Sequence, residues 1–508
     1  MLAPEKILLP EKKEIRYRKS MGRIWGIVLV GLLLTGCTAF RKKPNTDLMQ
    51  SVNLSPSAKK ALDESTFIAG DWPDPNWWEQ YGDPQLNEVV ENALGGNPTL
   101  QTASETVKKA EALATKALSS LIPHFSGHWM NNYMHLSDHS LFRLPPSNAP
   151  SVLNQVDLGV SMNYEIDFFG KNQSKYKAAI GDYYSQMAAN AMSNLKIAHA
   201  TTIAYVRFTY LTLRVELYDE IIDSLMEVKD LTLLRKAHNL DSQFPLLQIE
   251  EGIKAAEKVR TLYQSQKDIA VMQLRVLMGM SPDAEFEMKR PRLVDVYNIA
   301  LPNKLSIDLL ARRPDVMAAR WNAEARAADI GAAKAAYYPS VNLFSYGGLE
   351  SLSYTDLFNV SSFMGMLLPS INLPIFTGFE LEADLNKAHA EYSIAVYEYN
   401  GKVLEAANDV AKTLRLIQAD KDKKDEQYQK TFFKKREEEL MALRFENGIS
   451  QKIDVLQKKI AYLQERAELL NDEQNYYEQV INLNRALGGG YGSKPRESKP
   501  TCGCKRGS

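Results

Sequence analysis

The sequence predicts a mainly α-helical protein with a small transmembrane β portion, built from two copies of one structural unit. An alternating apolar and polar pattern at 156–168 is typical of a strand with one apolar and one polar face. The next stretch, 170–239, covers 69 positions without a proline, which predicts a helix roughly 100 Å long. The same interval of 69 positions recurs at 378–447, so we infer an internal duplication.

The elements around the long helices repeat as well. Prolines 25 positions apart bound one helical run at 98–123 and another at 314–339. Downstream, Leu-Met-Gly at 277–279 matches Ala-Leu-Gly at 486–488. Each copy therefore reads helix, strand, loop, strand, very long helix, turn and helix.

The N-terminus is typical of a bacterial lipoprotein signal. Arg23 precedes an apolar run that is too short to span a bilayer as a mature helix, and Leu34-Thr35-Gly36-Cys37 resembles the lipobox that closes such a signal. We expect translation to start at Met21 and Cys37 to carry a covalent lipid. Thr38 follows in place of the Asp that retains lipoproteins at the inner membrane, which favours the outer membrane.

The predicted organisation has six segments. They are a signal peptide at 1–36, a lipid-anchored tether at 37–70, a first repeat at 71–279, a linker at 280–302, a second repeat at 303–488 and a disordered tail at 489–508.

Composition excludes several classes of function. A net charge of −1 provides no field for binding nucleic acid. The cysteines, Cys37, Cys502 and Cys504, lie outside the repeats, so no disulfide framework is expected there. Enzyme motifs are absent from the sequence, and no catalytic residue, metal site or cofactor other than the lipid on Cys37 is expected. A metal at the histidines of 124–139 is the alternative to ordinary strand histidines.

Four strands of membrane length are expected, at about 124–135, 156–168, 340–348 and 362–375. Four strands cannot close a barrel that admits solute, and an open sheet in lipid leaves its edges unpaired. Three chains supply twelve strands, so we expect a homotrimer with a 12-stranded β-barrel, four strands per chain. Pro369 predicts a bulge or a strand end in the last run.

The second long helix and the helix after it carry coiled-coil spacing. The positions are Val396, Tyr399, Val403, Ala406, Val410, Thr413 and Ile417, and then Leu456, Ile460, Leu463, Ala467 and Leu470. This pattern predicts an antiparallel hairpin that turns at Asn447-Gly448. The charged run 420–439 is interpreted as a solvated helix face, with docking of a partner's helical hairpin as the alternative.

An aromatic cluster follows the tether. It contains Trp72, Trp77, Trp78 and Tyr81, and we expect it to pack the end of the tether against the helices. A platform for sugar binding is the alternative.

Several motifs, taken together, resemble the TolC-type outer membrane efflux proteins. They are Trp77-Trp78 with Gly82-Asp83-Pro84, Asn97-Pro98, Arg313-Pro314, Tyr338-Pro339-Ser340, Leu373-Pro374-Ile375-Phe376 with Gly378, and Ala486-Leu487-Gly488. The lipobox points to the lipid-anchored multidrug branch. The resemblance covers 72–490 and implies a trimeric barrel continued by a long α-helical periplasmic barrel. It further implies a periplasmic adaptor protein and an inner-membrane RND-type pump as partners.

The same resemblance implies where the duct constricts. The turn containing Phe445, Asn447, Gly448 and Ser450 is similar to the family's periplasmic tip, where acidic residues form rings. Asp454 matches the first acidic position, and Gln457 stands where a second Asp is found in the family. An ordinary exposed helix Asp is the alternative for Asp454. In the first copy Leu246 stands at the position of Asp454. Gly170 and Gly378 are expected to join barrel to helix.

The resemblance implies a passive exit duct for drugs or other small molecules, in which an inward lean of the second hairpin closes the tip. Two alternatives remain at this stage. One is a duct for peptide or protein export by type I secretion, and the other is a lipid-anchored periplasmic coiled-coil protein without a pore.

Overall fold

The computed structural model describes residues 46–492 except 51–53, 55, 57–59, 61–66, 140–142, 144, 146–148, 241, 294–298 and 303–310. The predicted start at Met21, the lipid site Cys37 and both C-terminal cysteines lie outside these residues. Two compact units are present, and each combines parts of both sequence repeats. One, the sheet unit, contains 116–178 and 326–394, and the other, the helical unit, contains 48–115, 179–325 and 395–492.

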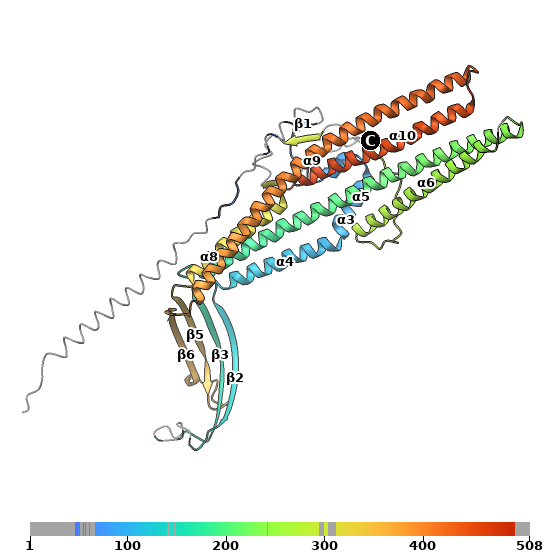
Figure 1. Cartoon of the computed structure of the whole chain (residues 1–508). Coiled ribbons are helices and arrows are strands. Elements are labelled where there is room, and N and C mark those ends of the chain that lie inside the picture. The colour runs from blue at the N-terminus through green and yellow to red at the C-terminus, as the bar shows by residue number, and fades with distance from the viewer. Residues whose placement is uncertain are drawn as a thin grey trace, which may run out of the picture. The chain divides into compact units, whose positions relative to one another are not determined.

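Long helices make up most of the described chain (Figure 1). The helices are α3 (Pro84–Gly96), α4 (Pro98–Ser119), α5 (Lys171–Ala237), α6 (Phe244–Leu277), α8 (Pro314–Ala335), α9 (Glu380–Glu446) and α10 (Lys452–Ala486), with short 3₁₀ helices η2 (Trp77–Tyr81) and η4 (Val360–Ser362). The strands are β1 (Phe67–Gly70), β2 (His124–His135), β3 (Val152–Ile166), β4 (Ile299–Pro302), β5 (Ser340–Ser351) and β6 (Phe363–Asn372).

The sheet unit is organised around an antiparallel sheet in the order β2-β3-β5-β6 (Figure 1). Its two faces differ, as the alternation in β3 predicts. The register places Phe125, Trp129 and Tyr133 on the same face as the apolar residues of β3, and these rings are exposed. On the other face lie the polar residues of β3, including Asp157. The predicted four-stranded β portion with one apolar face is therefore confirmed.

Strand ends differ from the expected ones in the second copy. β6 runs through Pro369, which lies opposite Leu343, so the predicted bulge or strand end at this proline is wrong. The reason is that β6 is an edge strand of this sheet, and an edge position tolerates a residue that cannot donate a hydrogen bond. The first strand of that copy continues to Ser351, beyond the predicted end at 348.

Both long helices are 67 residues in length and end close to the predicted positions. All seven predicted seam positions of α9 are buried: Val396, Tyr399, Val403, Ala406, Val410, Thr413 and Ile417. Four of the five in α10 are also buried, and Ile460 is half-buried. Figure 1 shows α9 and α10 side by side, so the predicted hairpin is confirmed. None of the described helices is both long enough and apolar enough to cross a membrane.

In both copies a glycine near the end of the repeat lies against the backbone near its beginning, and we call this contact the glycine joint. A Cβ on Gly279 would lie 2.1 Å from the carbonyl oxygen of Gly96, and a Cβ on Gly488 would lie 2.0 Å from that of Arg312. Both glycines have a positive φ, 78° and 91°. Each joint therefore seats the turn after α6 or α10 against the residues just before α4 or α8, and only glycine fits there.

A polar side chain reinforces each joint, and the two copies use different residues. Asn97 Nδ2 donates to the Leu277 carbonyl at 2.8 Å in the first copy. In the second copy Arg313 Nη1 contacts the Ala486 carbonyl at 3.4 Å. The helical unit continues past the predicted repeat end at 488, and a Cβ on Gly489 would lie 2.2 Å from Cδ1 of Leu195.

A two-stranded parallel sheet, β1 with β4, was not expected from the sequence. Phe67, Ile299 and Leu301 from this sheet are buried in the core of the helical unit. β1 lies in the predicted tether and β4 in the predicted linker. Each strand is four residues long, which is too short for alternation to be recognised.

Candidate functional site

The turn between α9 and α10 is built by a left-handed glycine. Gly448 has φ 73°, and the amide of Ile449 donates to the Arg444 carbonyl at 2.8 Å. Asn447 caps the helix from its side chain, because Nδ2 donates to the Leu443 carbonyl at 2.7 Å. Ser450 Oγ lies 3.4 Å from the Met441 carbonyl. These contacts satisfy the last carbonyls of α9 and fix a tight reversal.

Asp454 has a local structural task at this turn. Its carboxylate accepts the backbone N–H of Gln451 at 3.0 Å, and the Gln451 side chain accepts from the backbone of Asp454, which together form a capping box. The Asp454 side chain is half-buried. Its negative charge sits in the first turn of α10, where the helix dipole stabilises an anion.

Gln457 faces a groove between the two hairpins. The groove has a volume of about 380 Å³ and is lined by Leu225 and Arg235 of α5, Ile249 of α6, and Gln451 and Gln457 near the start of α10, among others. The family resemblance makes Gln457, like Asp454, a candidate for the periplasmic constriction. In the structure its side chain lines this groove of mixed apolar and amide character.

Polar contacts tie α5 to α10 beside the turn. Arg235 Nη1 donates to Gln451 Oε1 at 2.5 Å, and Lys452 forms an ion pair with Glu227. Two helical turns further along α10, Lys459 pairs with Glu220 at 2.9 Å. We call the pairs Arg235–Gln451 and Lys452–Glu227 the hairpin latch.

The hairpin latch was missed by sequence reasoning. Its partners are about 216 to 225 positions apart along the chain, and charged residues on long helices are most simply interpreted as solvated. The one available signal in the sequence is the repeat offset of about 209 positions. It makes α5 equivalent to α9, and so makes the turn after α5 equivalent to the turn after α9.

The first copy turns in the same way with a different residue. Asn239 takes the left-handed conformation with φ 54°, and Leu240 N donates to the Arg235 carbonyl at 2.9 Å. Leu246, at the position equivalent to Asp454, is 8% exposed. The first copy thus places an apolar residue in its core where the second carries a carboxylate.

The predicted strand-to-helix junctions both lie at left-handed glycines. Gly170 has φ 74° and Gly378 has φ 63°. At the first junction Asp167 Oδ2 accepts the backbone N–H of Gln173 at 2.7 Å, which caps α5. Phe169 stacks on Tyr338, with ring centroids 4.7 Å apart. This stacking joins the junction of the first copy to the start of β5 in the second.

The polar face of the sheet carries a small network around Asp157. The Tyr346 hydroxyl donates to the Asp157 carboxylate, and His128 Nε2 lies 3.6 Å from it. His124 instead contacts the Ser119 carbonyl, and the register puts His135 on the apolar face. Among the described residues, no three or more His, Cys, Asp or Glu side chains are grouped to hold a metal ion.

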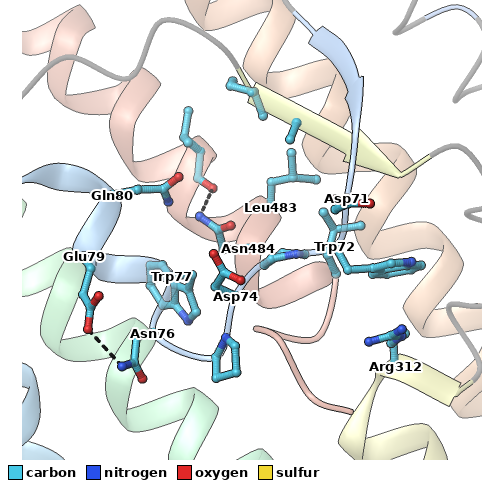
Figure 2. Close-up of a pocket in the computed structure, with 16 residues that line it drawn as sticks. Asp71, Trp72, Asp74, Asn76, Trp77, Glu79, Gln80, Arg312, Leu483 and Asn484 are labelled. Atoms are coloured by element: carbon cyan, nitrogen blue, oxygen red, sulfur yellow. Dashed lines mark hydrogen bonds between the residues drawn. The ribbon is translucent and has the colours of Figure 1, made fainter. Parts of the chain in front are cut away.

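A cavity of about 1030 Å³ lies beside the aromatic cluster in the helical unit (Figure 2). Trp77 is 3% exposed and packs edge-on against Trp78, while Arg312 lies over the ring of Trp72 at 5.8 Å. Tyr81 is fully buried in the same core as α5 and α10. Trp77, Trp78 and Tyr81 therefore pack as expected, while Trp72 is half-buried at the wall of the cavity.

Comparison with known proteins identifies relatives across both repeats. The family described as outer membrane efflux protein matches 89–280 and 305–489. The multidrug resistance outer membrane protein MdtP of Escherichia coli K12 is 26% identical over 472 residues, which are 91% of this chain and 95% of that protein. The fusaric acid resistance protein FusA of Burkholderia cepacia is 30% identical over 368 residues, 72% of this chain and 68% of FusA.

A solved structure gives the same result for the fold. The outer membrane protein VceC from Vibrio cholerae superposes with a TM-score of 0.73 at 27% identity, and the match covers 82% of this chain and all of that one.

Proposed function

Because the chain belongs to the outer membrane efflux protein family, we propose that it is the outer-membrane exit duct of a tripartite efflux pump. The observation that carries this proposal is the four-stranded sheet with one exposed apolar face, in a chain whose two repeats both match the family. The duct is passive and has no catalytic step, because an inner-membrane RND-type pump supplies the energy through a periplasmic adaptor.

Three copies form the duct. In one chain β2 and β6 are the edges of the sheet, and a sheet in lipid must pair its edges. The helical unit likewise leaves large apolar side chains uncovered, such as Leu262 and Val276 on α6 and Phe432 and Phe433 on α9. Each of these is about half exposed, which suits contact with a second copy of the chain.

The turn between α9 and α10 is the periplasmic end of the duct, and Asp454 lines its constriction. Threefold symmetry brings three Asp454 carboxylates around one axis, where they attract cations. Opening the duct requires the second hairpin to move away from the first, which breaks the hairpin latch. The groove that contains Gln457 is where the adaptor docks and biases this two-state packing.

The cargo is small molecules, and the protein is held at the outer membrane by a lipid on Cys37. Relatives are named for resistance to multiple drugs and to an organic acid, which supports small cargo. The same names do not favour peptide or protein export, and a coiled-coil protein without a pore leaves the apolar face of the sheet without a role. No cofactor other than the lipid takes part.

Reconstitution into planar bilayers tests the duct. We expect the full-length protein to purify as a trimer in detergent and to give discrete conductance steps. A matched pair of variants tests the sheet: Val160→Arg places a charge on the apolar face and costs about 2–4 kcal/mol in lipid, whereas Ser161→Arg places it on the polar face. Val160→Arg should abolish insertion, and Ser161→Arg should insert and alter conductance. A monomer without conductance would refute the duct.

A further inference from the structure

A second cavity lies in the helical unit, away from the turn and the hairpin latch. It is an open recess with a volume of about 240 Å³, bounded by α5, α6 and α10. Its lining includes Arg207, Leu211 and Arg214 of α5, Ile269 and Gln273 of α6, and Gln474 of α10. This volume is just below the range of roughly 300–1,000 Å³ typical of drug-sized pockets, so it suits a ligand with a single ring.

Arg214 is the unusual residue of this cavity. It is 6% exposed, and its Nε has no hydrogen-bond partner. Its Nη2 donates to the amide oxygen of Asn471 at 3.2 Å, and its guanidinium lies 5.6 Å from the ring centre of Tyr263. No carboxylate of the described residues forms an ion pair with it. Burial lowers the pKa of Arg214, since Glu468 and Glu478 act on it only through longer-range attraction.

Arg313 shows how the same chain treats a buried arginine that serves packing alone. Arg313 is 4% exposed, and its guanidinium makes two hydrogen bonds to the carboxylate of Asp315, at 2.7 and 3.0 Å. A third reaches Asp409 at 3.2 Å. Burial of a charge costs free energy unless opposite charge and hydrogen bonds offset it. Arg313 has two carboxylates in direct contact, whereas Arg214 has only the amide of Asn471, the ring of Tyr263 and carboxylates that act from a longer range.

The rest of the cavity complements an organic anion. The Oε1 atom of Gln474 is buried without a donor, while its Nε2 donates to Glu478 at 2.9 Å. Arg207, at the same cavity, is held by both carboxylate oxygens of Glu478. Leu211 and Ile269 supply apolar wall. Arg214 and Gln474 both line the recess, and each keeps an unpaired polar atom, Nε and Oε1, buried behind its surface. A ligand with a carboxylate, a ring and one donor group would supply both missing partners once these side chains turn toward it.

The cavity lies on the side of α5 that faces away from α3. The Tyr205 hydroxyl donates to Asp83, the N-cap residue of α3. The side of α5 that carries Tyr205 is therefore covered by α3. With 3.6 residues per turn, Arg207 and Arg214 lie on the opposite side of the helix from Tyr205. On that side α5 meets α6 and α10, which line the rest of the recess.

We propose that the cavity at Arg214 is a binding site for small aromatic monocarboxylates on their way through the duct. The inference rests on the proposed function for its role in transport. The binding itself depends only on the cavity and can be measured without transport. A carboxylate forms charge-assisted hydrogen bonds with the guanidinium, its ring packs on Leu211 and Ile269, and its donor reaches Gln474.

The test measures equilibrium binding of salicylate to the full-length trimer in detergent at pH 7.5. The intrinsic fluorescence of salicylate reports the binding. Salicylamide, which is neutral and of similar shape, serves as the ligand control. We expect salicylate to bind at least about tenfold more tightly than salicylamide, the factor that a charged hydrogen bond supplies. Equal binding of the two, or no binding of salicylate, overturns the proposal.

Two variants place the site. Arg214→Gln removes the charge and should weaken salicylate binding at least about tenfold. Gln273→Glu is isosteric and fixes a carboxylate at the cavity wall, which should compete with salicylate to a similar degree. Gln248→Glu, the same exchange on α6 outside this cavity, should change binding less than about twofold. Unchanged binding in Gln273→Glu overturns the proposal even if Arg214→Gln does not fold.

The alternative is that a carboxylate side chain of a neighbouring copy pairs with Arg214 in the trimer, in place of a bound ligand. In that case Arg214→Gln would break the trimer into folded monomers, and wild-type trimers would not bind salicylate, which also overturns the proposal. Conductance is recorded on the same preparations. Normal conductance without salicylate binding rejects this inference alone, while absent conductance rejects the proposed function.

Discussion

Single polar residues in this chain combine a local structural task with a proposed role in the assembly. Asp454 completes a capping box at the start of α10, and in a trimer its charge would be repeated around the duct axis. The family resemblance predicted the second role from the position of the residue. The first depends on a backbone contact to Gln451 that a sequence pattern indicates only weakly.

Replacing Asp454 with Asn separates the two tasks. Asn retains an oxygen that accepts the Gln451 N–H, so we expect the free energy of unfolding to change by less than about 1 kcal/mol. Loss of three negative charges should lower cation selectivity and weaken block by divalent cations in single-channel recordings. Asp425→Asn, an exposed change on α9, is the control. Identical selectivity in all three proteins would remove Asp454 from the constriction.

His199 makes the stability of the helical unit depend on pH. Its Nε2 lies 2.8 Å from Asn482 Oδ1, and burial lowers its pKa to about 4, although the hydrogen bond opposes the shift. In the unfolded chain a histidine titrates near pH 6.5. Between these values the unfolded chain binds a proton that the folded chain does not. The folded state therefore loses stability as pH falls from 6.5 towards 4, by at most about 3 kcal/mol.

Chemical denaturation at pH 7.5 and at pH 5.0 measures this loss. His199→Gln removes the titrating group and should show a smaller fall in unfolding free energy between the two pH values than the wild type. His238→Gln, at an exposed position near the end of α5, should retain the wild-type fall. A fall of the same size in His199→Gln would mean that other groups account for it.

Helices and turns were the elements that the sequence predicted best. The ends of α5 and α9 follow from Asn239 and Gly448, which can adopt the left-handed conformation that stops a helix. The α9 seam was predicted without error, because a heptad pattern directly encodes which side of a helix is buried.

Elements that depend on distant partners were not predictable. β1 and β4 form only because each finds the other across more than 200 positions, and four residues carry too little pattern alone. Pro369 was misjudged because its effect depends on whether the strand is an edge, which is a property of the sheet. The unpaired state of Arg214 likewise depends on which side chains of α6 and α10 surround it.

The glycine joint that closes each copy gives a test at this level. Gly488→Ala forces a Cβ to within 2.0 Å of a backbone oxygen at a φ of 91°, and we expect a loss of about 2–4 kcal/mol in unfolding free energy. Gly401→Ala, inside α9, meets no atom within 4 Å and should stabilise by about 0.5–1 kcal/mol. Thermal unfolding of both variants measures the contrast. Equal effects of the two changes would mean that the joint can relax.

The complete molecule is proposed to depend on a lipid as well as on its strands. Cys37→Ser removes the predicted site of acylation. We expect it to abolish labelling by radioactive palmitate and to reduce the amount of protein in the outer membrane, while conductance of the purified trimer remains. Cys502→Ser should retain the label. Palmitate incorporated into Cys37→Ser would place the lipid on another residue.

The pairing of β3 with β5 brings the two repeats together within one chain, edge to edge. Between chains, the proposed trimer needs the same kind of edge contact, β6 with the β2 of a neighbour. The ring then consists of six like parts joined by six like seams, and the covalent linkage between repeats has already made three of them. Only three molecules must meet, so the assembly rate depends less steeply on concentration than that of a ring of six separate parts.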